Sequence, residues 1–274
     1  MSTLLDLLSG LLPFLYGGLV GVYLHLLLRD GAGAKRVAEP LLAGTVTLHL
    51  LFLAGEAVLL DRHPMANKFE IFTFVAFIVA ASYLWVERRR GNSCTGVFPL
   101  SLALLLQVCA SLGRPTRVEV PEILDNPLFA WHAGAATAAL AAFSVGAVYG
   151  VLFLVQYRAL KRGRLGEVAM RMPSMDVLSR MSLHAGEVGW VALTLTVGLG
   201  DIWVSETPTI TLADPKVWTT FLVWGIYSLA LGGHFFRRWG GWRVVTLNLS
   251  AYALLVGSLL TVGRVFDTFH RFTG

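Results

Sequence analysis

The chain has 274 residues, of which 55% are hydrophobic and only 14% are charged, and its mean hydropathy is +0.66. This composition leaves too little polar surface for a soluble globule and predicts a polytopic membrane protein. The net charge of +5 does not indicate a nucleic-acid partner, because the basic residues lie between apolar segments, where they set membrane topology.

Eight apolar segments are close to the roughly 20 residues that a helix needs to cross a bilayer. They are expected to be helices, because backbone groups in lipid must pair internally and these runs are too continuous for barrel strands. The sequence therefore predicts an all-α bundle in a single domain over residues 1–274, with a retained first span. The predicted spans are 9–28, 40–60, 68–87, a short one at 97–112, a long one at 129–157, 184–204, 216–236 and 243–263.

The basic residues predict the orientation of these spans. The loops on one side hold seven of the 22 Lys and Arg residues, and the loops on the other side hold fifteen. The positive-inside rule then places both termini and the loop 201–215 outside a cell's inner membrane, with the basic loop 158–182 in the cytoplasm. That basic loop is expected to be a solvated connector, and docking of a cytoplasmic partner or an anionic lipid is the alternative.

The histidines fall at distinct depths in this topology. A single histidine at a membrane boundary is usually an interfacial or hydrogen-bonded residue. Imidazoles on separate helices, without a cluster of thiolates or carboxylates, suit haem iron better than structural zinc. No C-x-x-C-H motif is present, so the sequence favours non-covalent haem b, in one or more copies. The candidates are His132 and His270 at the outer face, His25, His184 and His234 near the inner face, and His49 near the middle of its span.

Two carboxylates lie near these histidines in the sequence. Glu56 follows His49 by two helical turns, and Glu187 follows His184 by three residues, so each pair shares a helix face. Each carboxylate could orient a ligating imidazole or carry protons, or it could simply reach an interface.

Several short motifs together resemble the cytochrome c assembly protein family. These are the tryptophan-rich, haem-handling membrane proteins of the CcsA type, which include a shorter HemX-like branch. The likeness covers about residues 40–274. Its motifs are Asp214-Pro215-Lys216-x-Trp218, Trp224-x-x-Tyr227, His234, Gly241-Trp242-Arg243, His63-Pro64-x-x-Asn67-x-x-Glu70, Trp131-His132 and Arg171-x-Pro173-Ser174-x-Asp176.

The resemblance implies a membrane protein that binds haem b for cytochrome c biogenesis. An outer haem would be held by His132 and His270 beneath the loop 201–215, with Trp203, Asp214 and Trp218 beside it. His234 matches the family histidine that points to a haem within the membrane. The implied partners are other membrane subunits of an assembly complex and an outer-side cytochrome c.

The chain departs from the family pattern in its outer loop. Only Trp203 remains of a loop that is rich in tryptophan in the family, Ala213 precedes Asp214, and Val217 replaces a glutamate. His234 follows the tryptophan of the Trp224-x-x-Tyr227 motif by ten residues instead of eight.

Two other functions remain open. Histidines at two depths would also suit a haem b electron-transfer subunit of a respiratory complex that exchanges electrons with quinone. A haem-free, HemX-like scaffold could instead stabilise a cytoplasmic enzyme through the loop 158–182. An independent catalytic activity is not favoured, because the sequence has no nucleophile–base constellation, phosphate loop or metalloprotease motif.

Overall fold

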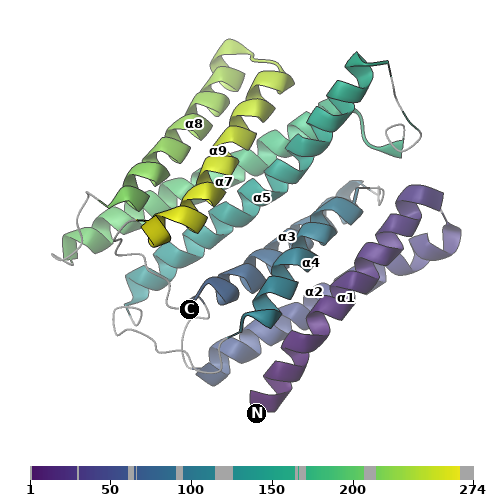
Figure 1. Ribbon diagram of the computed structural model, residues 1–274, viewed down its shortest axis with the longest axis horizontal. Helices are drawn as coiled ribbons and strands as arrows, with labels where there is room; N and C mark the ends of the chain where they lie inside the picture. Colours follow the sequence, from purple (N-terminus) through teal and green to yellow (C-terminus); the bar gives the residue numbers. More distant parts are fainter. Residues whose placement is uncertain are drawn as a thin grey trace. The chain divides into compact units, whose positions relative to one another are not determined.

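The computed structural model describes residues 2–29, 31–60, 65, 67–90, 95–114, 126–163, 166, 171–206 and 214–265. Within these ranges the chain forms eight α-helices and no strand, which confirms the predicted all-α fold (Figure 1). His270 and the central part of the predicted outer loop, residues 207–213, lie outside the described residues.

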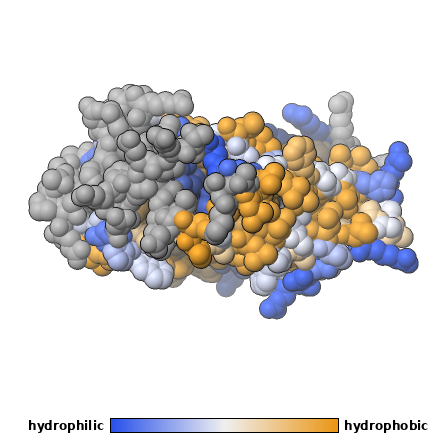
Figure 2. Space-filling model, turned by 90° about the horizontal axis from the view of Figure 1, so that it is seen from below, coloured by the Kyte–Doolittle hydropathy of each residue, from blue (hydrophilic) through white to orange (hydrophobic). Residues whose placement is uncertain are grey.

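By length and composition, five helices could cross a membrane: α1 (Ser2–Arg29), α2 (Ala32–Leu60), α3 (Lys68–Arg90), α5 (Pro127–Lys161) and α9 (Gly241–Val265). The apolar α4 (Val97–Leu112) has only 16 residues, and α7 (Met175–Glu206) and α8 (Pro215–Arg237) cover the other two predicted spans. Figure 2 shows hydrophobic side chains over a broad area of one face, as a surface in contact with lipid requires. The fold is that of a polytopic helical membrane protein.

Most helices extend beyond the predicted spans. α1 begins at Ser2 instead of residue 9, α2 at Ala32 instead of residue 40, and α7 at Met175 instead of residue 184. Hydropathy identifies only the apolar part of a helix. The helix itself continues into turns of mixed polarity, because those residues still pair their backbone groups within it.

The chain folds into two compact units. Unit 1 contains α1–α4, and unit 2 contains α5, α7, α8 and α9.

Unit 1 is a four-helix bundle in which each helix contacts the next and α4 contacts α1 (Figure 1). The core face of α1 consists of Leu12, Tyr16, Leu19 and Tyr23, all with 0% exposure. Their spacing of four, three and four residues places them on one stripe of the helix. Gly96, just before α4, lies where a Cβ atom would come within 2.4 Å of Tyr23, so the close approach of α4 to α1 requires a glycine here.

Unit 2 consists of the packed pair α5 and α7 and the hairpin of α8 and α9 (Figure 1). α9 contacts α5 and α7, and α7 also contacts α8. At the centre, Phe143 of α5 stacks on Tyr227 of α8 with ring centroids 3.8 Å apart. The hydroxyl of Tyr227 donates a hydrogen bond of 3.2 Å to the carbonyl oxygen of Asn248 on α9. These contacts join three helices at one level.

Two of the motifs that carry the family resemblance are helix starts. Asn67 Oδ1 accepts a hydrogen bond of 3.0 Å from the backbone N–H of Glu70, while Asn67 Nδ2 donates to Glu70 Oε1 at 2.8 Å. Asp214 Oδ1 accepts from the backbone N–H of Lys216 at 2.7 Å, and Pro215 occupies the first helical position of α8. Side-chain oxygens at these positions satisfy N–H groups that have no partner inside the helix.

Candidate functional site

His132 lies in the second turn of α5, near the end of unit 2 where that helix begins. The helix is capped by Asn126, whose Oδ1 accepts a hydrogen bond of 2.8 Å from the backbone N–H of Leu128. This cap fixes the first turns of α5 and therefore the position from which His132 reaches α7.

The imidazole of His132 is held by a backbone atom of α7. Its Nδ1 lies 3.0 Å from the carbonyl oxygen of Thr196. Because a carbonyl oxygen only accepts hydrogen bonds, Nδ1 carries the proton, and the Nε2 of the neutral ring keeps a lone pair. Among the described residues, none hydrogen-bonds to this Nε2. The ring therefore has a fixed orientation and one nitrogen available as a ligand.

The face of α7 beside His132 is shaped to fit the ring. A Cβ atom on Gly200 would lie only 3.1 Å from His132 Cε1, so α7 approaches the imidazole more closely than an alanine would allow without a shift. Trp203, 3% exposed, lies with its ring centroid 6.0 Å from that of His132 and 5.5 Å from that of Phe129. Thr196, Gly200 and Trp203 follow at helical spacing, so one stripe of α7 supports the ring.

The start of α8 contributes a cap and an exposed tryptophan. Asp214 is 7% exposed and uses one carboxylate oxygen for its helix cap, whereas Trp218 is 66% exposed. Trp131, the neighbour of His132, is 72% exposed. The predicted grouping of His132 with Trp203 is thus present in the structure, while Asp214 has a structural role of its own.

The other described histidines have separate surroundings. His184 on α7 is exposed, and its Nδ1 lies 3.0 Å from Glu187 Oε2, so the two residues form the pair that their spacing indicates. His234 is half-buried near the end of α8, with its ring edge-on to Phe235. His25 on α1 is exposed.

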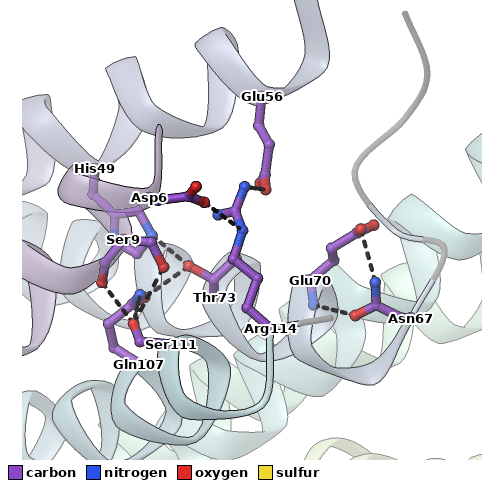
Figure 3. Close-up of polar contacts among 10 residues, drawn as sticks. All are labelled: Asp6, Ser9, His49, Glu56, Asn67, Glu70, Thr73, Gln107, Ser111 and Arg114. Carbon is purple, nitrogen blue, oxygen red and sulfur yellow. Dashed lines mark hydrogen bonds and ion pairs between the residues drawn. The ribbon is translucent and has the colours of Figure 1, made fainter. Parts of the chain in front are cut away.

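His49 is fully buried in unit 1 within a chain of hydrogen bonds (Figure 3). Its Nδ1 lies 2.9 Å from the hydroxyl of Tyr16, and its Nε2 lies 3.0 Å from Thr73 Oγ1. The chain continues from Thr73 to Gln107 Oε1 at 2.7 Å and from Gln107 Nε2 to Ser111 Oγ at 3.1 Å. It ends at the carbonyl oxygen of Ser9, which lies 2.7 Å from Ser111 Oγ.

The direction of each hydrogen bond in this chain follows from its neighbour. The hydroxyl proton of Thr73 points to Gln107, so the Thr73 oxygen accepts from His49 Nε2, and His49 Nδ1 must then accept from Tyr16. Both ring nitrogens of His49 are therefore occupied. Coordination of iron by this histidine would require the hydrogen bond from Tyr16 to break.

Glu56 does not supply either partner of His49, because Tyr16 and Thr73 do so. Instead Glu56, 3% exposed, forms an ion pair of 2.9 Å with Arg114, which also lies 3.7 Å from Asp6 (Figure 3). Sequence reasoning missed the polar partners of His49. A detectable signal was the placement of uncharged polar residues such as Gln107 inside apolar spans.

Comparison with known proteins agrees with the resemblance that the motifs suggested. The cytochrome C assembly protein family matches residues 65–270 of this chain, which is more than half of its length. Protein HemX of Brevibacillus brevis is 27% identical over 262 residues, covering 94% of this chain and 94% of that protein.

Two further relatives have other names and also match over most of their length. Inner membrane protein YpjD of Escherichia coli (strain K12) is 28% identical over 233 residues, covering 84% of this chain and 86% of that protein. Cytochrome c biogenesis protein CcsA of Prochlorococcus marinus (strain MIT 9312) is 24% identical over 251 residues, covering 83% and 80%. This chain is therefore a multi-pass membrane protein that belongs to the cytochrome C assembly protein family, and that membership supports a role in cytochrome c biogenesis.

Proposed function

We propose that this protein binds haem b through His132 and handles it during cytochrome c biogenesis. The observation that carries the proposal is the hydrogen bond of 3.0 Å between His132 Nδ1 and the carbonyl oxygen of Thr196. A histidine that ligates a metal commonly donates its second N–H to a backbone carbonyl or a carboxylate. That bond fixes the tautomer and raises the basicity of the ligating nitrogen.

The surroundings of His132 fit a haem. Haem iron accepts an imidazole nitrogen as an axial ligand, and the apolar macrocycle packs against aromatic side chains. The half-buried Phe129 supplies aromatic surface, the buried Trp203 supports the imidazole, and Nε2 supplies the lone pair. Bound haem would contribute the iron and its redox chemistry, while the residues of this chain hold and orient it. By resemblance, His270 would be the second residue that holds the iron of this haem, and His234 would hold a haem within the membrane.

The length of α5 supports a location at a membrane surface. His132 and Arg158 are 26 residues apart on this helix, which corresponds to about 39 Å along its axis. A bilayer with its headgroups is about 40–45 Å thick. If Arg158 lies at the cytoplasmic surface, as the basic residues predict, His132 reaches the outer surface, where an apocytochrome c would be accessible.

The first experiment is an absorption spectrum of the purified protein and of the variant His132→Ala. We expect the unchanged protein to show the Soret band and α/β bands of a bis-imidazole haem b, and the variant to lose the outer haem. Added imidazole should restore part of the band, because it can occupy the space that the side chain leaves. A spectrum that is identical in both proteins would exclude His132 as a ligand.

A pair of glycine variants tests the positioning of the ring. A Cβ atom at Gly200 would press on His132, whereas a Cβ atom at Gly198 would meet nothing within 4 Å. Gly200→Ala should therefore weaken or shift the haem spectrum, and Gly198→Ala should leave it unchanged. Equal effects of the two substitutions would argue that the close approach of α7 does not matter for the ligand.

The same spectra separate the alternative functions. Haem that stays bound through purification and is reversibly reduced by a quinol would favour an electron-transfer subunit. Protein that carries no haem, and whose behaviour is unaffected by His132→Ala, would favour a scaffold for a cytoplasmic enzyme. Co-purification with other membrane subunits and an outer-side cytochrome c is expected for the assembly role.

A further inference from the structure

The end of unit 2 that is opposite to His132 is densely basic. Here α5 and α8 end and α7 and α9 begin. An ion pair of 2.8 Å with Asp176 neutralises Arg180. No described side chain pairs with the guanidinium of Arg158 or Arg243. The exposed cations at this end are Arg158, Lys161, Arg162, Arg180, Arg237, Arg238 and Arg243.

Two of these cations are sequence neighbours of two aromatic residues that contact each other. Tyr157 of α5 and Trp242 of α9 lie with their ring centroids 4.7 Å apart. Arg158 directly follows the tyrosine, and Arg243 directly follows the tryptophan. One arginine from each helix is therefore attached one residue away from a contact that joins the two helices, and the two arginine backbones lie close to that contact.

The packing of α9 holds this arrangement in place. A Cβ atom on Gly241, the first residue of α9, would lie 2.9 Å from Ser179 Cβ of α7 and 3.6 Å from the ring of Phe153 on α5. The start of α9 is thus wedged between two helices. The backbone that carries its arginine and tryptophan therefore has little freedom to move relative to α5, which reduces the entropy that ligand binding would cost.

The chemistry of the surface combines phosphate recognition with membrane contact. Guanidinium groups bind phosphate oxygens, and Tyr and Trp favour the headgroup level of a bilayer. Exposed apolar side chains lie among these cations, for example Val155 at 52% and Leu160 at 48% exposure on α5 and Phe236 at 89% on α8. A soluble anion would leave this apolar surface uncovered, whereas acyl chains would cover it.

We propose that Arg158 and Arg243 bind the phosphate of an anionic phospholipid, with the Tyr157–Trp242 pair beside its headgroup. A zwitterionic lipid carries its own cation next to the phosphate and would be repelled by the remaining arginines and lysines. The site therefore selects phosphatidylglycerol-type headgroups over phosphatidylcholine. It is independent of haem binding at His132.

The test uses full-length protein in nanodiscs of phosphatidylcholine alone or of an equimolar mixture with phosphatidylglycerol. Lipid retention is measured by native mass spectrometry, and stability is measured by thermal unfolding. The mixture should raise the midpoint of thermal unfolding and leave phosphatidylglycerol bound. The variant R158Q/R243Q should lose both effects, because it lacks the two guanidinium groups that bind the phosphate.

The matched control is the variant K161Q/R162Q, which removes the same charge from exposed positions just beyond the aromatic pair. It should keep most of the retained lipid. Equal loss in both double variants would overturn the proposal in favour of diffuse surface attraction. Stabilisation by inorganic phosphate in pure phosphatidylcholine, to the same extent as by the anionic lipid, would show that the arginines bind free phosphate instead.

Discussion

His132 and His49 show how the same side chain can be prepared for different purposes. His132 donates one hydrogen bond to a backbone carbonyl, and no residue in the described part of the chain bonds to its second nitrogen, whereas His49 has hydrogen-bond partners on both nitrogens. The sequence predicts different depths for the two rings, but depth does not show which hydrogen bonds each ring makes. Those bonds depend on partners that come from other helices.

The buried hydrogen-bond chain around His49 predicts how strongly substitutions along it lower the free energy of unfolding. Thr73→Val preserves the shape of the side chain but leaves His49 Nε2–H and Gln107 Oε1 without their partner. Each buried group left unpaired costs about 1–3 kcal/mol. Tyr16→Phe leaves only His49 Nδ1 unpaired and should cost about half as much. Chemical or thermal unfolding in detergent would measure the difference in free energy of unfolding.

The control for this series is Thr246→Val. The hydroxyl of Thr246 is exposed and bonds only within its own helix, to the carbonyl oxygen of Trp242 at 2.7 Å. Its removal should change the free energy of unfolding little. If Thr73→Val lowered the free energy of unfolding no more than Thr246→Val does, the hydrogen bonds assigned to Thr73 would be contradicted.

Sequence analysis found the side chains of the candidate haem site but not what holds them. The resemblance named His132 and Trp203, and the structure brings their ring centroids to 6.0 Å. The partner of the imidazole is the carbonyl oxygen of Thr196, and the space for the ring comes from Gly200. A backbone acceptor and a missing Cβ atom leave no chemical signature in a sequence.

At the level of secondary-structure elements, the start of α8 shows that a motif associated with function can also have a structural role. The resemblance associates Asp214 with haem, yet its carboxylate caps the helix that carries Trp218. The existence and order of the helices followed from hydropathy, and the caps at Asn67 and Asp214 explain where two of them begin. The turns that lengthen α1, α2 and α7 could not be predicted from hydropathy, because charged residues such as Asp6, Lys35 and Asp176 interrupt their apolar side chains.

Two variants of Asp214 separate capping from a direct contact with haem. Asp214→Asn keeps a good N-cap without the charge, whereas Asp214→Ala loses the cap and should cost about 1 kcal/mol. If Asp214 acts only as a cap, the asparagine variant should match the unchanged protein in thermal unfolding and in its haem spectrum. Loss of haem in the asparagine variant with unchanged unfolding would show that the carboxylate itself contributes.

At the level of the whole molecule, the distribution of charge predicts which way the protein faces. The exposed cations at one end of unit 2 belong on the cytoplasmic side by the positive-inside rule, and His132 lies about 39 Å away along α5. Both termini should then lie outside. Alkaline phosphatase fused after residue 274 should be active, and the same enzyme fused after residue 163 should be inactive.

Green fluorescent protein fused at the same two positions provides the complement. It should fluoresce after residue 163 and remain dark at the C-terminus when exported through the general secretion pathway. The opposite pattern would place His132 on the cytoplasmic side and would remove the outer haem from the proposed function.

The hydrogen-bond chain of unit 1 has a sense of direction, from a phenol that donates to a carbonyl that can only accept. No single link can reverse alone, since turning over the amide of Gln107 would set its N–H against the hydroxyl proton of Thr73 and its oxygen against an acceptor. The five links between Tyr16 and Ser9 therefore run in one direction and form as a cooperative set. A change at either end of this hydrogen-bond chain would affect all four helices of unit 1, because the bonds pass through α1, α2, α3 and α4 before they return to α1.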